Sequence, residues 1–166
     1  PGIPTNPKTT MGAIVSKVQY DRVLSYIEAG KQDGARLIAG GKRPGEPHLA
    51  EGFYVEPTVF ADVTMDMRIG KEEIFGPVVA LIPFESFDEA IEIANGVAYG
   101  LSASIYTKNV NQAFAAMRDI YTGIVYVNAP TIGAETHLPF GGTKQTGNGH
   151  REAGVGKGLG HDRAID

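Results

Sequence analysis

The sequence predicts a three-layer α/β fold in which a mainly parallel sheet is flanked by helices. The first observation is the segment at residues 78–84, VVALIPF, which is apolar at almost every position. Such a run is typical of a strand that is covered on both faces, as in a parallel sheet between helices. The second is that strand and helix patterns alternate from there to residue 128 with short connections, which favours right-handed crossovers between parallel strands.

Residues 16–33 show the first helix pattern, because apolar side chains recur there on one face of a 3.6-residue repeat. The side chains on that face are Tyr20, Val23, Leu24 and Ile27. Gly34 follows and is expected to end the helix. Before residue 72 the sequence then predicts, in order, a strand at 36–39, a polar turn region at 42–52, extended segments at 53–63 broken at Pro57, and a helical turn at 65–71.

A second group of elements follows the apolar strand. Residues 86–89, SFDE, have the form of a capping box, in which a serine and a glutamate satisfy the first free N–H groups of a helix. We expect this helix at 88–95, with Ala90, Ile91 and Ala94 buried. The later elements expected are a strand at 102–107, a helix at 110–120 with Asn109 as its cap and Val110, Ala113, Phe114 and Met117 on its apolar face, a strand at 124–128, and a glycine-rich region without either period at 131–160.

The composition excludes several classes of function. The chain has a formal net charge of −4 and no basic run, which argues against a surface for nucleic acid or anionic membranes. It has no cysteine, so disulfides, thiolate metal sites and a cysteine nucleophile are excluded within these residues. Its longest apolar stretch is far shorter than a membrane span, and its first ten residues show no signal pattern, so a cytoplasmic location is the default expectation.

Neither a metal site nor a nucleotide loop is predicted. The glycine-containing run at 147–152, GNGHRE, begins like a dinucleotide fingerprint, but Glu152 replaces the third glycine and no apolar strand precedes it. No Ser, His and Asp arrangement stands out, although one assembled only in the folded chain stays open. No ligand spacing, such as two side chains on one helical face, links the histidines, which are His48, His137, His150 and His161.

Residues 72–79, EEIFGPVV, hold the first candidate binding residues in a tight loop, which Gly76 and Pro77 favour. The carboxylate of Glu73 has the acceptors to bind both hydroxyls of a ribose. The ring of Phe75 is able to pack on a nicotinamide or on a substrate ring. A solvated glutamate near a helix end and a core aromatic show the same local pattern, so the residues alone leave both interpretations open.

A second tight turn, PFGG at residues 139–142, contains Phe140. The turn places this ring either at a pocket wall or in a plain buried turn, and the local sequence favours neither alternative.

Four ordered motifs closely resemble the aldehyde dehydrogenase superfamily. The segments at 7–41 and 52–60 look like the family region that follows the catalytic nucleophile, so the resemblance covers about residues 3–154. It implies a partial catalytic domain of this family at 1–154 and an atypical tail at 155–166. The four motifs are EEIFGPVV at 72–79, ANGVAYGLSASIYT at 94–107, GIVYVN at 123–128 and LPFGG at 138–142.

The resemblance implies roles for particular residues. Glu73 would hold the nicotinamide ribose of NAD or NADP, and Phe75 would pack near the nicotinamide. Phe140 and Asn128 would lie near the substrate pocket, and His137 would be a substrate-loop residue. Residues 136–154 look most like the branch of the family that acts on semialdehydes.

The departures from the family bear on activity. In the family a cysteine thiolate attacks the aldehyde, hydride passes to NAD(P), and a glutamate-activated water releases the acid. The cysteine, that glutamate, the oxyanion-stabilising asparagine and most of the cofactor domain are absent from this sequence. We therefore predict that the isolated chain does not oxidise aldehydes and binds no cofactor tightly. Ala13 stands where the family usually has proline, and the tail does not resemble the family's oligomer-forming continuation.

Three interpretations follow from the resemblance. The chain is the C-terminal catalytic-domain portion of an NAD(P)-dependent aldehyde or semialdehyde dehydrogenase, a truncated piece of one, or a non-catalytic binding or assembly module from a split or decayed gene. For the truncated piece and for the product of a split or decayed gene alike, the surface that normally meets the missing half should be unusually apolar. Self-association, or docking to that half, is then the expected partnership.

Overall fold

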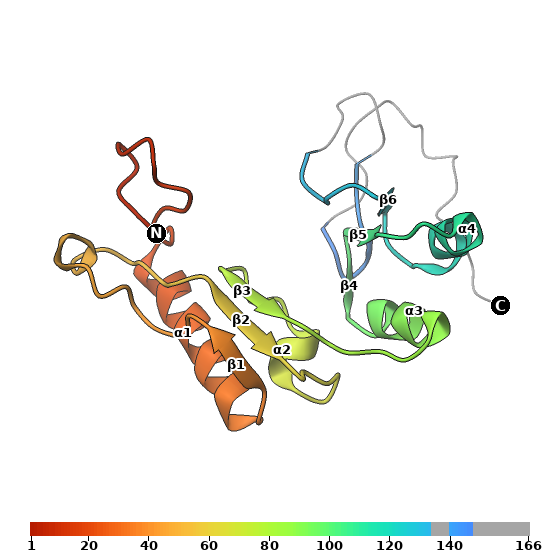
Figure 1. The fold of residues 1–166 in the computed structure, drawn as a ribbon, viewed down its shortest axis with the longest axis horizontal. Coiled ribbons are helices and arrows are strands. Elements are labelled where there is room, and N and C mark those ends of the chain that lie inside the picture. The colour runs from red at the N-terminus through yellow and green to blue at the C-terminus, as the bar shows by residue number, and fades with distance from the viewer. Residues whose placement is uncertain (134–139, 148–166) are drawn as a thin grey trace. The chain divides into compact units, whose positions relative to one another are not determined.

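The chain divides into two units after Phe84 (Figure 1). A computed structural model describes residues 1–133 and 140–147. The first unit is Pro1–Phe84, and the described residues from Glu85 onward belong to the second. His137 and the tail expected at 155–166 lie outside the described residues.

The first helix, α1 (Lys17–Gln32), begins and ends where the sequence predicts. Ser16 is its N-cap, and the Ser16 hydroxyl accepts a hydrogen bond from the backbone N–H of Gln19 at 3.2 Å. After the helix, Gly34 has a φ of +92°, a left-handed conformation that glycine adopts without steric cost. The chain therefore reverses at once into β1 (Arg36–Ala39).

The sheet of the first unit has the order β1-β2-β3. Its central strand, β2 (Thr58–Ala61), pairs in parallel with β3 (Val78–Ala80), and β1 pairs antiparallel on the other side of β2. The predicted parallel pairing is thus present at β2 and β3, while β1 is an antiparallel edge. Two short helices complete the unit, the 3-10 helix η1 (Pro47–Leu49) and α2 (Arg68–Lys71).

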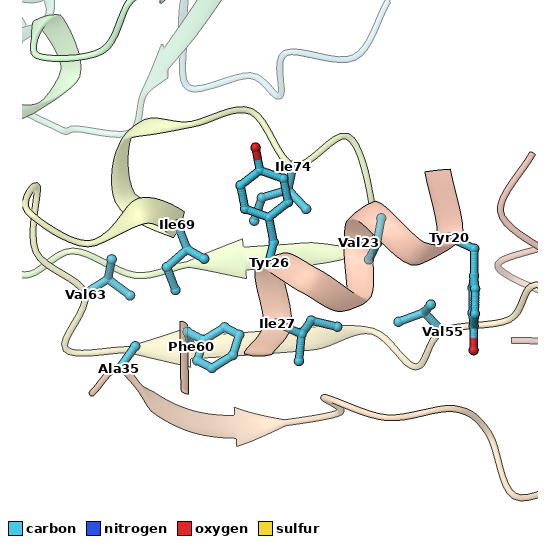
Figure 2. Close-up of a cluster of buried hydrophobic side chains, with 10 residues drawn as sticks. All are labelled: Tyr20, Val23, Tyr26, Ile27, Ala35, Val55, Phe60, Val63, Ile69 and Ile74. Carbon is cyan, nitrogen blue, oxygen red and sulfur yellow. The ribbon is translucent and has the colours of Figure 1, made fainter. Parts of the chain in front are cut away.

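The core of the first unit lies between α1 and the sheet (Figure 2). Val23 and Ile27 of α1 and Phe60 of β2 are completely buried, and burial of each such side chain stabilises the fold by about 1.5–3 kcal/mol. Tyr20 is buried as predicted and Leu24 packs at the margin, whereas the buried Tyr26 was not expected on this face. The other buried members are Ala35, Val55, Val63, Ile69 and Ile74.

The apolar segment after Pro77 is covered on one face only in the described structure. Val78, Ala80 and Ile82 pack against the core, while Val79 is 52% exposed and Leu81 47% exposed. Successive side chains of a strand point to opposite faces, so the run supplies one packed face and one open face. The expectation of a strand over 78–84 covered on both faces is therefore wrong in detail, and β3 is also shorter.

The second unit contains two small sheets and two helices. A parallel pair joins β5 (Ser102–Ile105) to β6 (Ile124–Val127), and an antiparallel pair joins β4 (Tyr99–Gly100) to β7 (Thr143–Lys144). The helices are α3 (Phe87–Asn95) and α4 (Val110–Asp119). The predicted alternation of strands and helices is thus confirmed. β5 and β6 are slightly shorter than the strands expected at 102–107 and 124–128, and β4 and β7 were not expected.

Both helices of the second unit begin at the predicted caps. The Ser86 hydroxyl accepts from the N–H of Glu89 at 3.1 Å, and the Glu89 carboxylate accepts from the N–H of Glu85 at 2.7 Å. The side-chain oxygen of Asn109 accepts from the N–H groups of Asn111 and Gln112 at 3.0 and 3.4 Å. These local contacts define the helix starts without help from distant residues.

The predicted apolar face of α4 is only partly buried. Ala113 is buried as expected, but Val110 is 63%, Phe114 65% and Met117 41% exposed. Ala116 and, just after the helix, Ile120 are also buried. In α3 the residues expected in the core are also only half-buried, and they are Ala90, Ile91 and Ala94.

We expect Phe60→Ala to lower the free energy of unfolding by about 3–5 kcal/mol, because it opens a cavity among completely buried side chains. Phe84→Ala is the matched control, since Phe84 is 59% exposed, and it should change stability by at most about 0.5 kcal/mol. Urea unfolding of the full chain, followed by circular dichroism, measures both. Equal losses for the two variants would contradict the position of the core.

Candidate functional site

The loop between α2 and β3, residues 72–77, carries the first candidate residues. At its far end the carbonyl of Pro77 accepts a hydrogen bond from the N–H of Thr58 at 2.8 Å, which continues the pairing of β2 and β3. Gly76 lies so close to Val23 of α1 that a side chain at this position would collide with the valine. The loop is therefore fixed to the sheet at one end and lies directly on the helix.

Two side chains of α1 bind the backbone of this loop. The Gln19 amide nitrogen donates to the carbonyls of Ile74 and Phe75, each at 3.0 Å. The Arg22 guanidinium donates to the carbonyl of Glu73, also at 3.0 Å. Three consecutive carbonyls of the loop are thus satisfied by one helix rather than by a strand partner.

Glu72 ties α2 to α1 beside the loop. Its carboxylate accepts hydrogen bonds from the Tyr26 hydroxyl at 2.8 Å and from the Arg68 guanidinium at 2.9 Å. The Arg68 guanidinium also lies over the Tyr26 ring, 4.2 Å from its centre. The hydrogen bonds from Arg68 and Tyr26 hold the pKa of the Glu72 carboxyl below its ordinary value.

The loop presents Glu73 and Phe75 outward and turns Ile74 inward. Ile74 is 8% exposed and joins the core near Tyr26 (Figure 2). The Phe75 side chain is 74% exposed, and its backbone has a φ of +56°, which costs a residue with a side chain about 1–3 kcal/mol. Glu73 is exposed, and no residue in the described part of the chain makes a hydrogen bond or ion pair with its carboxylate.

Asn128, the next candidate, follows β6 in the second unit. Its side-chain oxygen accepts from the N–H of Thr107 at 2.9 Å, and its side-chain nitrogen donates to the carbonyl of Thr107 at 3.0 Å. The amide thus pairs with a backbone as a strand neighbour would, with the Asn128 backbone at a φ of +53°. The contact joins the ends of β5 and β6, and a position near a substrate stays a prediction.

Phe140, the candidate at the second turn, is half-buried where the described chain resumes. The turn after it is held by Lys144, whose ammonium donates to the carbonyls of Asn95 and Val97 at 2.8 and 3.0 Å at the end of α3. Burial lowers the pKa of Lys144, and a cation at a helix C-terminus is favoured by the helix dipole. The structure therefore defines the backbone beside Phe140, while His137 lies outside the described residues.

The residues that hold the Glu73 loop were not predicted from the sequence. Gln19, Arg22 and Tyr26 recur at i, i+3 and i+7, so they share one side of α1. Polar side chains in that pattern normally indicate a solvated face. A stripe of polar residues that borders the apolar face is the one local signal that would have pointed to a second contact.

The described residues show neither a metal centre nor a membrane helix. In residues 1–133 and 140–147 no group of three or more His, Cys, Asp or Glu side chains is placed to hold a metal ion. No helix in the same part of the chain is long and apolar enough to cross a membrane.

Comparison with known proteins identifies relatives over nearly the whole chain. The model of the aldehyde dehydrogenase family matches residues 1–160. An α-ketoglutaric semialdehyde dehydrogenase of Bacillus subtilis is 49% identical over 144 residues, which are 87% of this chain and 30% of the relative. The chain thus spans about a third of the curated relative's length.

Solved structures agree with the sequence comparison. An aldehyde dehydrogenase of Mycobacterium tuberculosis complexed with NAD⁺ is 41% identical, with a TM-score of 0.86 over 92% of this chain and 31% of that one. The NAD⁺ complex of an aldehyde dehydrogenase from Bacillus cereus is 46% identical, with a TM-score of 0.83 over 90% of this chain and 29% of that one. These likenesses confirm the predicted α/β fold class.

We expect the stabilising effect of Glu72 to disappear in acid. Because its pKa is lowered in the folded chain, the contribution is present above the unfolded-state pKa and is lost as the pH falls through the folded-state pKa. Glu72→Gln should therefore lower the urea midpoint at neutral pH and lose this effect towards about pH 2.5, below the range of ordinary carboxyl groups.

Glu73→Gln is the matched control, because the neighbouring carboxylate has no partner among the described residues. Its urea midpoint should follow that of the unmodified chain throughout the titration. A Glu72→Gln effect that is the same at neutral and acid pH would contradict the assigned contacts.

Proposed function

The chain belongs to the aldehyde dehydrogenase family, and we propose that it is the C-terminal catalytic-domain portion of an NAD(P)-dependent enzyme that oxidises an aldehyde to a carboxylic acid. The observation that best supports this is the loop at 72–77, which presents a partner-free carboxylate and an exposed aromatic ring from a fixed backbone. The Phe75 backbone is also strained, with a φ of +56°, and strain of this kind clusters at active sites and ligand-binding loops.

Glu73 and Phe75 have the chemistry to hold a nicotinamide nucleotide. Two carboxylate oxygens of Glu73 are free among the described residues to accept from the two adjacent hydroxyls of a ribose. The Phe75 ring offers a flat apolar face of the kind that packs on a planar heterocycle. When bound, NAD or NADP supplies the hydride acceptor, and the part of these two residues is to orient it.

The remaining catalytic groups have to come from another part of the protein. The chain contains no cysteine, so it cannot supply the thiolate that would form a covalent intermediate with the aldehyde. Without that nucleophile the covalent intermediate does not form, so a correctly oriented cofactor would have no hydride to accept. We therefore propose that the 166 residues alone are inactive and bind the cofactor only weakly.

The substrate proposed for the complete enzyme is a semialdehyde. The supporting observation is the Bacillus subtilis relative, which is named as an α-ketoglutaric semialdehyde dehydrogenase. Phe140 is the described residue proposed to line the substrate pocket, with His137 as a second candidate outside the described residues. The Asn128 amide is engaged with Thr107, so its proposed role near the substrate is to shape the backbone there.

The exposed apolar stripe on α4 supports docking to the rest of the protein. Val110, Phe114 and Met117 lie at i, i+4 and i+7, and each is more than 40% exposed. The chain covers 30% of the curated relative, so the N-terminal half of such a protein is the proposed occupant, and self-association is the alternative in its absence. A non-catalytic assembly module would use the same stripe and is the second candidate function.

We expect a chimera to distinguish these functions. In the Bacillus subtilis relative, the aligned segment of 144 residues is replaced by the matching residues of this chain. NADH formation with α-ketoglutaric semialdehyde is measured for the chimera and for the isolated chain. The chimera should be active, because the relative supplies the thiolate, and the isolated chain should not. A folded but inactive chimera favours the assembly module, and aldehyde-dependent NADH formation by the isolated chain refutes the proposed division of labour.

Within the active chimera, Glu73→Ala should weaken NAD binding about 10- to 100-fold, because two hydrogen bonds to a charged acceptor are lost. The dissociation constant from fluorescence titration and the KM for NAD both measure this. Glu51→Ala is the control, since Glu51 is another exposed glutamate of the first unit and lies outside the loop. Equal NAD affinity in both variants would rule out the role proposed for Glu73.

A further inference from the structure

We propose that Gln19 and Arg22 are positioning residues, which orient the Glu73 carboxylate by holding the backbone of its loop. The inference rests on the function proposed for Glu73. It adds two residues from a helix distant in sequence, whose side chains contact the backbone of the loop. The juxtaposition that supports it is the contact of the two side chains with the carbonyls of residues 73–75.

The two side chains fix consecutive peptide groups. The Arg22 guanidinium donates to the carbonyl of Glu73. A single side-chain nitrogen of Gln19 donates to the carbonyls of the next two residues. A carbonyl that is held cannot rotate, so the Cα–Cβ direction of Glu73 is defined relative to α1. Since Glu73 makes no side-chain contact among the described residues, its backbone is what determines where the carboxylate lies.

The helix that provides these contacts is itself anchored in the core. Val23 and Ile27, on the adjacent face of α1, are completely buried. Gly76 touches Val23, so the loop approaches the helix at the point next to Arg22. Arg22 is further placed by Tyr26, whose ring centre lies 5.5 Å from the guanidinium carbon. Contacts with a helix that is anchored in the core therefore fix the position of the loop.

The backbone of the loop needs such support. Phe75 has a φ of +56°, which a residue with a bulky side chain adopts only when its surroundings impose it. Gln19 binds the carbonyls of Ile74 and Phe75, which belong to the two peptide groups on either side of the Phe75 Cα. Without the Gln19 amide, these peptide groups could rotate to an ordinary conformation. The Glu73 and Phe75 side chains would then point in other directions than they do here.

The expected signature differs from that of an ordinary structural contact. Arg22 is exposed and Gln19 only half-buried, so removal of their hydrogen bonds leaves no buried group without a partner. Global stability should therefore change little, while the loop loses its order. A contact that matters only for folding would show the reverse.

The experiment uses Gln19→Met and Arg22→Met in the active chimera, each alone and combined with Glu73→Ala. Each single variant should weaken NAD binding about 5-fold, with a smaller effect on kcat, because a misplaced carboxylate still attracts the ribose. In the Glu73→Ala background the same substitutions should have almost no further effect, since residues that act through one group are not additive. Arg22→Lys, which keeps a donor, should restore part of the affinity.

Backbone order parameters from NMR relaxation of the 166-residue chain give a readout that does not depend on activity. Gln19→Met should lower the order parameters of the amides in residues 73–76 and leave those of β2 unchanged. Gln32→Met is the matched control, because Gln32 is an exposed glutamine at the end of the same helix and contacts no part of the loop.

The possible failures are distinct. If Glu73→Ala leaves NAD affinity unchanged, the proposed function of Glu73 is wrong. If Glu73→Ala weakens binding but the Gln19 and Arg22 variants do not, or if their effects persist undiminished in the Glu73→Ala background, the positioning role is overturned. Unchanged order parameters at residues 73–76 in Gln19→Met would also overturn it.

Discussion

The packing of α1 against β2 is the interaction on which the candidate site depends. Val23, Ile27 and Phe60 are completely buried at this contact, and they fix the helix before any polar group is considered. The adjacent side of the helix then binds the carbonyls of the 72–77 loop. One helix thus provides an apolar face for stability and a polar edge for placement, and the loop inherits the rigidity of the core.

The loop itself departs from what stability alone would favour. Phe75 is exposed with a left-handed backbone, and the Glu73 carboxylate has no partner among the described residues. The neighbouring Glu72 shows the opposite arrangement, because Tyr26 and Arg68 satisfy its carboxylate. Of two adjacent glutamates, one is therefore bound within the fold, and the other is left open for the recognition role proposed for Glu73. Local conflicts of this kind are expected at functional sites, where the rest of the fold offsets their cost.

The sequence predicted what local physics determines. The caps at Ser16, Ser86 and Asn109 are decided within a few residues, and so the helix starts were confirmed. The hydrogen bonds of Gln19 to the loop join residues that are 55 and 56 positions apart in the sequence, and no local pattern predicts such a contact. The expected burial of the apolar stripe on α4 was wrong for the same reason, because periodicity identifies an apolar face but not what covers it. The role proposed for Glu73 rests on the resemblance of whole motifs, since its neighbouring residues alone favour a solvated glutamate.

The second unit suggests how a substrate would be discriminated. Its polar side chains next to the candidate residues are occupied by backbone, with the Asn128 amide on Thr107 and the Lys144 ammonium on the end of α3. Groups used in this way hold the turns in place and have little hydrogen-bonding capacity left for a ligand. In the enzyme proposed above, selection among aldehydes would then depend on shape at Phe140 and on polar side chains elsewhere in the protein. The held turns would supply a fixed frame, and different side chains on the same frame would select different aldehydes.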